Sequence, residues 1–279
     1  MVNRIARLNN HYYDIGTTNK SFLQVAKDLK QAGIKNCYFM LEIYDISLVN
    51  VDPYSVDKDG KSNLTKDQIS RIINECIRNP WYYLREISRI PDQGGGGIPY
   101  KANRGTIAQT WCFLHHIDSW LSLPRQQGKT QSALAIEGWA YGFGTTYSQF
   151  MFNNKSGDDA KENLRRLNSQ IELLPEYLRF SSIVNDDGKK EKSRTSATMM
   201  SNPITHNSIK ITAKATSYDR ALNLARGLSV PIIHFDEAEF TDFIDIIVNN
   251  SYPAFKKAAD NAIKNHSAAC RIFTSTPKK

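Results

Sequence analysis

The sequence predicts an α/β protein: a three-layer core with a mainly parallel sheet, preceded by a mostly helical N-terminal region. After the four glycines at 94–97, short apolar runs alternate with helix-forming stretches, which is typical of a parallel sheet with helical connections. Before these glycines, apolar residues recur at helical spacing. We therefore expect a helical lid or docking region over residues 1–97 and the α/β core over residues 98–279.

Composition and charge are those of a folded, basic protein. The 279 residues suffice for one or two domains, and 41% hydrophobic against 23% charged residues exclude a disordered chain. No stretch has the roughly 18 consecutive apolar residues of a membrane span, and the N-terminus lacks a signal-peptide core, so we expect a cytoplasmic protein without membrane contact. The four cysteines are dispersed, which predicts reduced thiols rather than a zinc site. The net charge of +8 favours an acidic polymer such as nucleic acid as a partner.

The N-terminal region contains three helical signals. The first is a helix that ends near Gly33. Thr65 and Gln68 then form a capping box before apolar residues at helical spacing, which predicts a helix over residues 66–79. Pro80 ends this pattern and begins an aromatic helical stretch.

The core is predicted to alternate strands and helices. The polar stretch 185–194 is predicted to be a turn or a hairpin tip. The expected strands are residues 119–123, 148–152, 209–213, 230–235 and 271–274, and the expected helices are residues 130–141, 158–173 and 242–264.

A candidate phosphate-binding loop follows the first core strand. The apolar run breaks at Pro124, and a helix-forming stretch begins just after Gly128, Lys129 and Thr130. In this strand, loop and helix context, the helix N-terminal amides and Lys129 bind phosphates, and the Thr130 hydroxyl can ligate Mg²⁺. Leu123 stands where the usual first glycine would be, and an ordinary helix start remains the alternative.

Two further strand ends support a P-loop NTPase core. Residues 230–235 form a buried-strand run that ends in Asp236 and Glu237. At the carboxyl edge of a parallel sheet, Asp236 would coordinate Mg²⁺ through water and Glu237 would polarise the attacking water. The last strand runs into the hydroxyls of residues 274–276, beside the expected γ-phosphate. For Asp236 and Glu237, the alternative is a strand that simply ends in a charged turn. For residues 274–276, the alternative is an ordinary turn after a strand.

Together and in this order, the motifs resemble those of the large terminases of tailed bacteriophages. The loop at 124–130, with arginine and glutamines where glycines are usual, resembles their deviant Walker A motif. Residues 235–238 resemble their Walker B motif with its catalytic glutamate, and residues 274–277 resemble their coupling motif. Residues 225–227 and 79–83 are also similar to this family. The match covers most of the chain from residue 79 onwards.

This resemblance implies an ATP-hydrolysing motor subunit that translocates viral double-stranded DNA into a procapsid. The implied cofactors are ATP and Mg²⁺. The implied partners are DNA, the portal protein of the procapsid, a small terminase subunit and further copies of the chain in a ring. The implied location is the host cell cytoplasm.

The resemblance also implies residue roles. Glu237 would be the catalytic base, and Thr130 and Asp236 would hold the metal. Arg125, or Arg226 before the Walker B strand, would be the arginine finger, acting within a subunit or on a ring neighbour, while a structural ion pair is the alternative for Arg226. The residues expected to contact the nucleotide are Gln109, Gln126, Gln127, Gly128, Lys129, Thr130, Asp236 and Thr276. Gln109 would read the adenine, and a glutamine on a helix surface is the alternative.

One departure limits the resemblance. Large terminases continue with a ribonuclease-H-like nuclease domain, whereas this sequence ends at Lys279, shortly after the coupling motif. We therefore assign no DNA cleavage to this chain, and we expect an ATPase core that is cut short. The alternatives are another nucleic-acid-stimulated P-loop ATPase, such as a helicase, and a fragment that binds nucleotide without hydrolysis.

Overall fold

The chain folds into two compact units. A computed structural model describes residues 4–92, 94–180, 182–184, 190–212, 214–224 and 229–277. Unit 1 comprises Met1–Ile107 and Ser169–Arg179, and unit 2 comprises Ala108–Asn168 and Phe180–Lys279. The domain division that the sequence predicts, after residue 97, stays a prediction.

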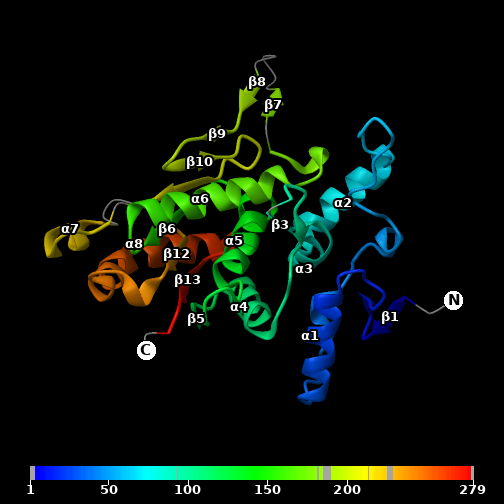
Figure 1. The fold of residues 1–279 in the computed structure, drawn as a ribbon, viewed down its shortest axis with the longest axis horizontal. Helices are drawn as coiled ribbons and strands as arrows, with labels where there is room; N and C mark the ends of the chain where they lie inside the picture. Colours follow the sequence, from blue (N-terminus) through cyan, green and yellow to red (C-terminus); the bar gives the residue numbers. More distant parts are fainter. Residues whose placement is uncertain are drawn as a thin grey trace. The chain divides into compact units, whose positions relative to one another are not determined.

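Unit 1 is mostly helical, as predicted, and also contains two small antiparallel strand pairs (Figure 1). Strand β1 (Ile5–Leu8) pairs with β2 (His11–Asp14), and β3 (Arg89–Ile90) pairs with β4 (Ile98–Pro99). The helices and helical turns are α1 (Lys20–Gln31), η1 (Phe39–Leu41), η2 (Ile46–Leu48), α2 (Lys66–Arg78), α3 (Pro80–Tyr82), the π-helical η3 (Tyr83–Ile87) and η5 (Glu176–Leu178). Helix α4 (Arg104–Leu114) begins in unit 1 and ends in unit 2.

Side-chain caps begin α2 and the helix that follows it. The backbone N–H of Gln68 donates to Thr65 Oγ1 over 3.2 Å, and the backbone N–H of Thr65 donates to Gln68 Oε1 over 2.9 Å. The predicted capping box is therefore confirmed. Pro80 stands at the first position of the next helix, whose N-cap Asn79 accepts the Tyr82 N–H over 3.0 Å. The predicted helix over residues 66–79 is therefore confirmed to within one residue.

Unit 2 is built on a seven-stranded sheet with the order β5-β13-β12-β6-β11-β10-β9. The first five strands in this order are parallel to one another, and β10 and β9 extend the sheet antiparallel. The strands are β5 (Ser119–Ser122), β6 (Gln149–Asn154), β9 (Arg194–Thr195), β10 (Met199–Ser201), β11 (Ser208–Ile211), β12 (Ile232–Asp236) and β13 (Cys270–Ser275). The predicted mainly parallel sheet is confirmed.

Helices cover both faces of this sheet. Ile233 and Phe235 of β12 pack in one buried cluster with Phe255 of α8 (Ile244–Lys264). His234, between them, points to the opposite face and contacts Glu137 of α5 (Lys129–Trp139). Helix α6 (Gly157–Glu172) lies on the same face as α5, and α7 (Tyr218–Asn223) contacts α8. The result is the predicted three-layer α/β core.

The predicted and observed elements differ in detail. Helix α5 changes at Ala140 into a π-helical turn, η4 (Ala140–Gly144), and the strand predicted at 209–213 ends at Ile211. The edge strand β9 and its neighbour β10 were not predicted. Strand β7 (Ser182–Val184) pairs antiparallel with β8 (Lys190–Lys192), in agreement with the predicted hairpin, while residues 185–189 lie outside the described residues.

Candidate active site

The carboxyl ends of β5, β12 and β13 meet at one edge of the sheet. Strand β13 lies between β5 and β12 and is parallel to both, so the residues that follow the three strands are brought together. The Leu123 N–H after β5 donates to the Ser275 carbonyl at the end of β13 over 3.1 Å. This is the edge at which ligands bind in open α/β sheets.

The loop after β5 is shaped to begin a helix at Lys129. Gly128 adopts φ +76, a left-handed conformation that glycine tolerates without a steric penalty, and Gln126 adopts φ 65. The first amides of α5 point towards this loop, because the first N–H groups of a helix have no intrahelical acceptor. Such a helix N-terminus favours anions. Arg125, Gln126, Gln127 and Gly128 are all exposed there.

Lys129 joins the loop to the two other strand ends. Its side chain is buried, with 6% of the residue exposed, and Nζ donates to Thr276 Oγ1 over 2.9 Å. Nζ also lies 3.8 Å from Glu237 Oε1, and Thr276 Oγ1 donates to the same oxygen over 3.5 Å. Glu237 has φ 50, an uncommon backbone conformation for a residue with a side chain, and such strain gathers at functional sites. An ammonium, a hydroxyl and a carboxylate thus share one small volume.

Asp236 is the most densely hydrogen-bonded acid of the site. Only 4% of it is exposed. Oδ1 accepts from Thr130 Oγ1 over 3.0 Å and from Thr274 Oγ1 over 2.5 Å, and Oδ2 accepts from Asn163 Nδ2 over 2.8 Å and from Asn154 Nδ2 over 3.2 Å. Four donors that converge on one carboxyl stabilise its anionic form.

Burial opposes the ionisation of Asp236 and would raise its pKa. The nearby His234 and the hydrogen bonds from Thr274, Asn163 and Thr130 outweigh this effect, so the pKa lies below its usual range. Asp236 is therefore a carboxylate at neutral pH.

The donor set fits a magnesium ion. Mg²⁺ prefers oxygen ligands and is typically held by one or two carboxylates together with phosphate oxygens and water. The Asp236 carboxylate and the Thr130 hydroxyl are 3.0 Å apart at the start of α5. In the part of the chain that the structure describes, no three His, Cys, Asp or Glu side chains form a metal-binding group.

The structure thus brings together five of the predicted site residues. These are Lys129, Thr130, Asp236, Glu237 and Thr276. Arg125 is exposed on the loop, and Arg226 lies outside the described residues. Gln109 is 2% exposed, so it does not lie on a helix surface, and neither amide atom has a hydrogen-bond partner among the described residues.

Sequence reasoning missed four residues of the site. Asn154 and Asn163 donate to Asp236, and His234 and Glu137 form a buried pair behind it. Asn154 could have been found, since it is a polar residue shortly after the strand predicted at 148–152, and the observed strand β6 pairs with β12. The other three lie inside a helix or a strand, where no local pattern distinguishes them.

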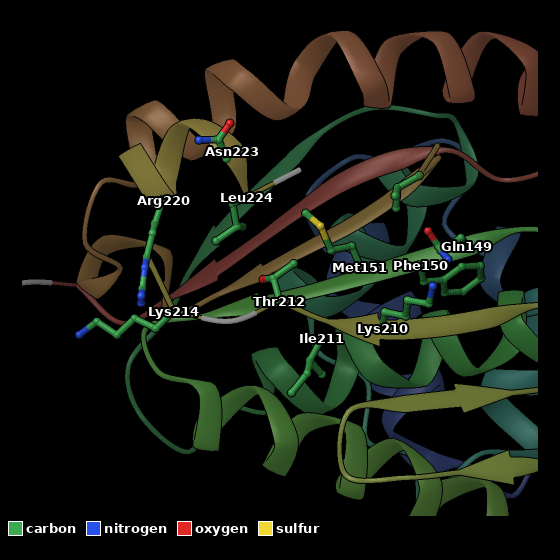
Figure 2. Close-up of a pocket in the computed structure, with 11 residues that line it drawn as sticks. Gln149, Phe150, Met151, Lys210, Ile211, Thr212, Lys214, Arg220, Asn223 and Leu224 are labelled. Atoms are coloured by element: carbon green, nitrogen blue, oxygen red, sulfur yellow. The ribbon is translucent and has the colours of Figure 1, made fainter. Parts of the chain in front are cut away.

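A separate hollow of about 490 Å³ lies beside α7 (Figure 2). Arg220 from α7 and Lys210 and Lys214 from the β11 side line it, with apolar residues such as Met151 between them. None of the predicted site residues that the structure describes is among those that line it.

Within the ranges described, no helix combines the length and the apolar character needed to cross a membrane. No protein-family model matches the sequence. No curated protein matches it either.

Three similar solved structures are large terminases. The HK97 bacteriophage large terminase has a TM-score of 0.46 and 16% identity, over 76% of this chain and 38% of that chain. The ATPase domain of the large terminase of Thermus phage P74-26 has a TM-score of 0.42 and 18% identity, over 68% of this chain and 70% of that domain. The large terminase of another bacteriophage, a thermophilic one, has a TM-score of 0.39 and 11% identity, over 62% of this chain and 38% of that chain.

The chain therefore spans well under half the length of the HK97 terminase and of the thermophilic bacteriophage's terminase. At these identities and TM-scores, the likeness transfers no residue role to this chain. These three structures are those of large terminases or of the ATPase domain of one.

Proposed function

We propose that the chain is a Mg²⁺-dependent ATPase and that its site lies at the start of α5. The convergence of Lys129, Thr130, Asp236 and Glu237 from three strand ends supports this proposal. Nucleotide hydrolysis needs a cation that binds phosphate, and a hydroxyl and a carboxylate that hold the metal. It also needs a second, less buried carboxylate that orients water.

The protein's own groups divide the task between them. The Lys129 ammonium and the first amides of α5 bind the β- and γ-phosphates, with the backbone of Gln126, Gln127 and Gly128 around them. Asp236 and Thr130 hold the metal, which neutralises phosphate charge when it is bound.

Glu237 is the proposed base. Its side chain is 23% exposed, so water can reach it, whereas Asp236 is almost fully covered. The Glu237 carboxylate orients the attacking water and accepts its proton. Thr276 donates to Glu237 and accepts from Lys129, so it holds the base and the cation in register.

Arg125 and Gln109 are proposed for two further roles. Arg125 is exposed on the loop, which leaves its guanidinium available as an arginine finger within the subunit or towards a ring neighbour. Arg226 is the alternative finger. The Gln109 amide, which has no hydrogen-bond partner among the described residues, is proposed to read the adenine, because both its donor and its acceptor match the adenine edge.

The motor function is the finer part of the proposal. The motif order that resembles large terminases supports ATP-driven translocation of viral double-stranded DNA into a procapsid, and the net charge of +8 suits a DNA partner. The partners would be the portal protein, a small terminase subunit and further copies of the chain in a ring, in the host cell cytoplasm.

Hydrolysis and strand separation distinguish the candidate functions. Phosphate release from Mg-ATP is measured with and without duplex DNA, and a fluorescent short duplex reports unwinding. We expect DNA-stimulated release without unwinding. Unwinding would instead identify a helicase, and nucleotide binding without any release would identify a fragment that does not hydrolyse.

A further inference from the structure

A buried chain of polar groups runs behind Asp236 across three elements. His234 Nδ1 lies 3.2 Å from Glu137 Oε2, His234 Nε2 lies 2.9 Å from Thr274 Oγ1, and Thr274 Oγ1 lies 2.5 Å from Asp236 Oδ1. Glu137, His234 and Thr274 are each at most 1% exposed. This buried series of hydrogen bonds therefore links α5, β12 and β13.

The hydrogen-bond directions in this chain follow from counting protons. Asp236 receives four donors and is a carboxylate, so it can only accept. Thr274 has one hydroxyl proton, which it donates to Asp236 Oδ1. Its oxygen is then an acceptor towards His234, and Nε2 of His234 must carry a proton.

The remaining proton lies between His234 Nδ1 and Glu137 Oε2. Either Nδ1 donates it to a carboxylate, or a carboxylic acid donates it to Nδ1. In both cases Nε2 keeps its proton, so His234 donates to Thr274 and Thr274 donates to Asp236. Glu137 thus orients the imidazole, as carboxylates that accept from a metal-bound histidine orient that histidine.

Stability alone gives a poor reason for this pair. Glu137 Oε1 is buried and has no hydrogen-bond partner among the described residues, which opposes folding. Apolar side chains of similar volume would avoid that cost, because replacing a buried polar pair by well-packed apolar groups is often neutral or stabilising. The pair is therefore better explained by what it does to Thr274.

We propose that His234, held by Glu137, is a positioning residue that fixes the Thr274 hydroxyl as a hydrogen-bond donor to Asp236. The inference rests on the proposed function, in which Asp236 and Thr130 hold the metal. Without the Nε2–H donor, the Thr274 hydroxyl is free to rotate, and Asp236 loses a fixed partner on the oxygen that also faces Thr130. The carboxylate is then less well oriented for Mg²⁺.

The first test reads the imidazole directly in the wild-type protein. Long-range ¹H–¹⁵N correlation spectra at one neutral pH, with the ring assigned through the backbone resonances of His234, report which ring nitrogens carry protons. We expect a proton on Nε2. A ring protonated only on Nδ1 would overturn the proposal, since Nε2 would then be an acceptor and Thr274 could not donate to Asp236.

The second test uses a matched pair of double variants. Glu137→Met/His234→Gln and Glu137→Met/His234→Leu both remove the buried pair, so neither leaves an unpaired carboxylate. They differ in that the glutamine supplies a side-chain N–H near the place of Nε2 and the leucine does not. Thermal unfolding checks that both fold.

The measurements are the Mg²⁺ dependence of fluorescent-ATP binding, kcat and KM. With leucine we expect the Mg²⁺ concentration for half-saturation to rise and kcat to fall by about tenfold, with KM little changed. With glutamine we expect substantial recovery of both. Equal behaviour of two folded double variants would overturn the proposal.

Failure of this inference and failure of the proposed function can be distinguished. Wild-type protein that binds nucleotide but releases no phosphate would contradict the proposed hydrolysis. The ring protonation and the Mg²⁺ dependence of binding would still test the role of His234, because neither requires turnover.

Discussion

Glu237→Gln is predicted to tighten ATP binding and to abolish turnover. Glu237 Oε1 lies 3.8 Å from Lys129 Nζ, so the carboxylate competes with phosphate for the ammonium. Coulomb's law gives this attraction as about 1 kcal/mol at the dielectric constant of water and about 4 kcal/mol at an effective value near 20. Desolvation of both groups, and solvent at the partly exposed Glu237, offset most of this attraction, so we expect a net effect of about 1 kcal/mol.

Neutralising Glu237 therefore frees the Lys129 ammonium for phosphate. A gain of about 1 kcal/mol corresponds to roughly fivefold tighter binding of ATP. Glutamine cannot accept the proton of the attacking water, and the loss of a general base typically costs about 10²–10⁴ in rate. The variant is thus expected to hold ATP more tightly while hydrolysis nearly stops.

Anisotropy of a fluorescent ATP analogue measures the binding, and phosphate release measures the turnover. Glu239→Gln is the matched control, because it neutralises a nearby acid. The Glu239 carboxylate accepts a hydrogen bond from Ser122, whereas Thr276 donates to Glu237. Turnover of Glu239→Gln should match that of the wild type. Wild-type turnover in Glu237→Gln, or loss of its ATP binding, would refute the assignment of Glu237 as the base.

Three further predictions concern stability and DNA binding. Hydrogen bonds from Arg165, together with the charges of Arg165 and Arg166, lower the pKa of Glu162 to about 2, so its stabilising contribution is lost as pH falls from about 4.5 towards 2. Glu162→Gln should unfold with a flatter pH dependence in that window, and an unchanged curve would contradict this. Glu75 is buried and accepts two backbone amides and the Asn79 side chain, so Glu75→Ala should destabilise the protein by about 3 kcal/mol, seen as a lower urea midpoint. Affinity for duplex DNA should fall steeply with salt, because phosphate contacts release counterions, and a flat response would argue against a DNA partner.

The parts of the site that are local in sequence could be predicted. Gly128, Lys129 and Thr130 are consecutive, and Asp236 and Glu237 directly follow an apolar run, so each motif is visible in a short window. Their meeting also follows from the fold class, since the carboxyl ends of parallel strands share one edge.

The parts that depend on distant contacts could not be predicted. Glu137 and His234 are 97 residues apart, and nothing in the sequence of either α5 or β12 indicates that they form a pair. Asn163 donates to Asp236 from the interior of α6, where a polar residue is expected to face solvent. Helix α6 begins in unit 2, but its last residues and those up to Arg179 belong to unit 1, a division that no local pattern indicates.

Local geometry also changed some predicted boundaries. Phe243 adopts φ 57, and α8 begins at Ile244 instead of at the predicted residue 242. Strand β10 consists of only Met199–Ser201, too short to show the alternation of a strand. Such features depend on backbone conformation and on pairing with β11, which residue types alone do not determine.

Phosphate release from Mg-ATP by the wild-type chain and by Lys129→Ala tests whether the start of α5 is an ATPase site. Lys129 is the cation that joins the three strand ends, and its removal takes away the charge proposed to bind phosphate. We expect release by the wild type and almost none by a folded Lys129→Ala variant, with folding checked by circular dichroism. Equal release by the two proteins would contradict it.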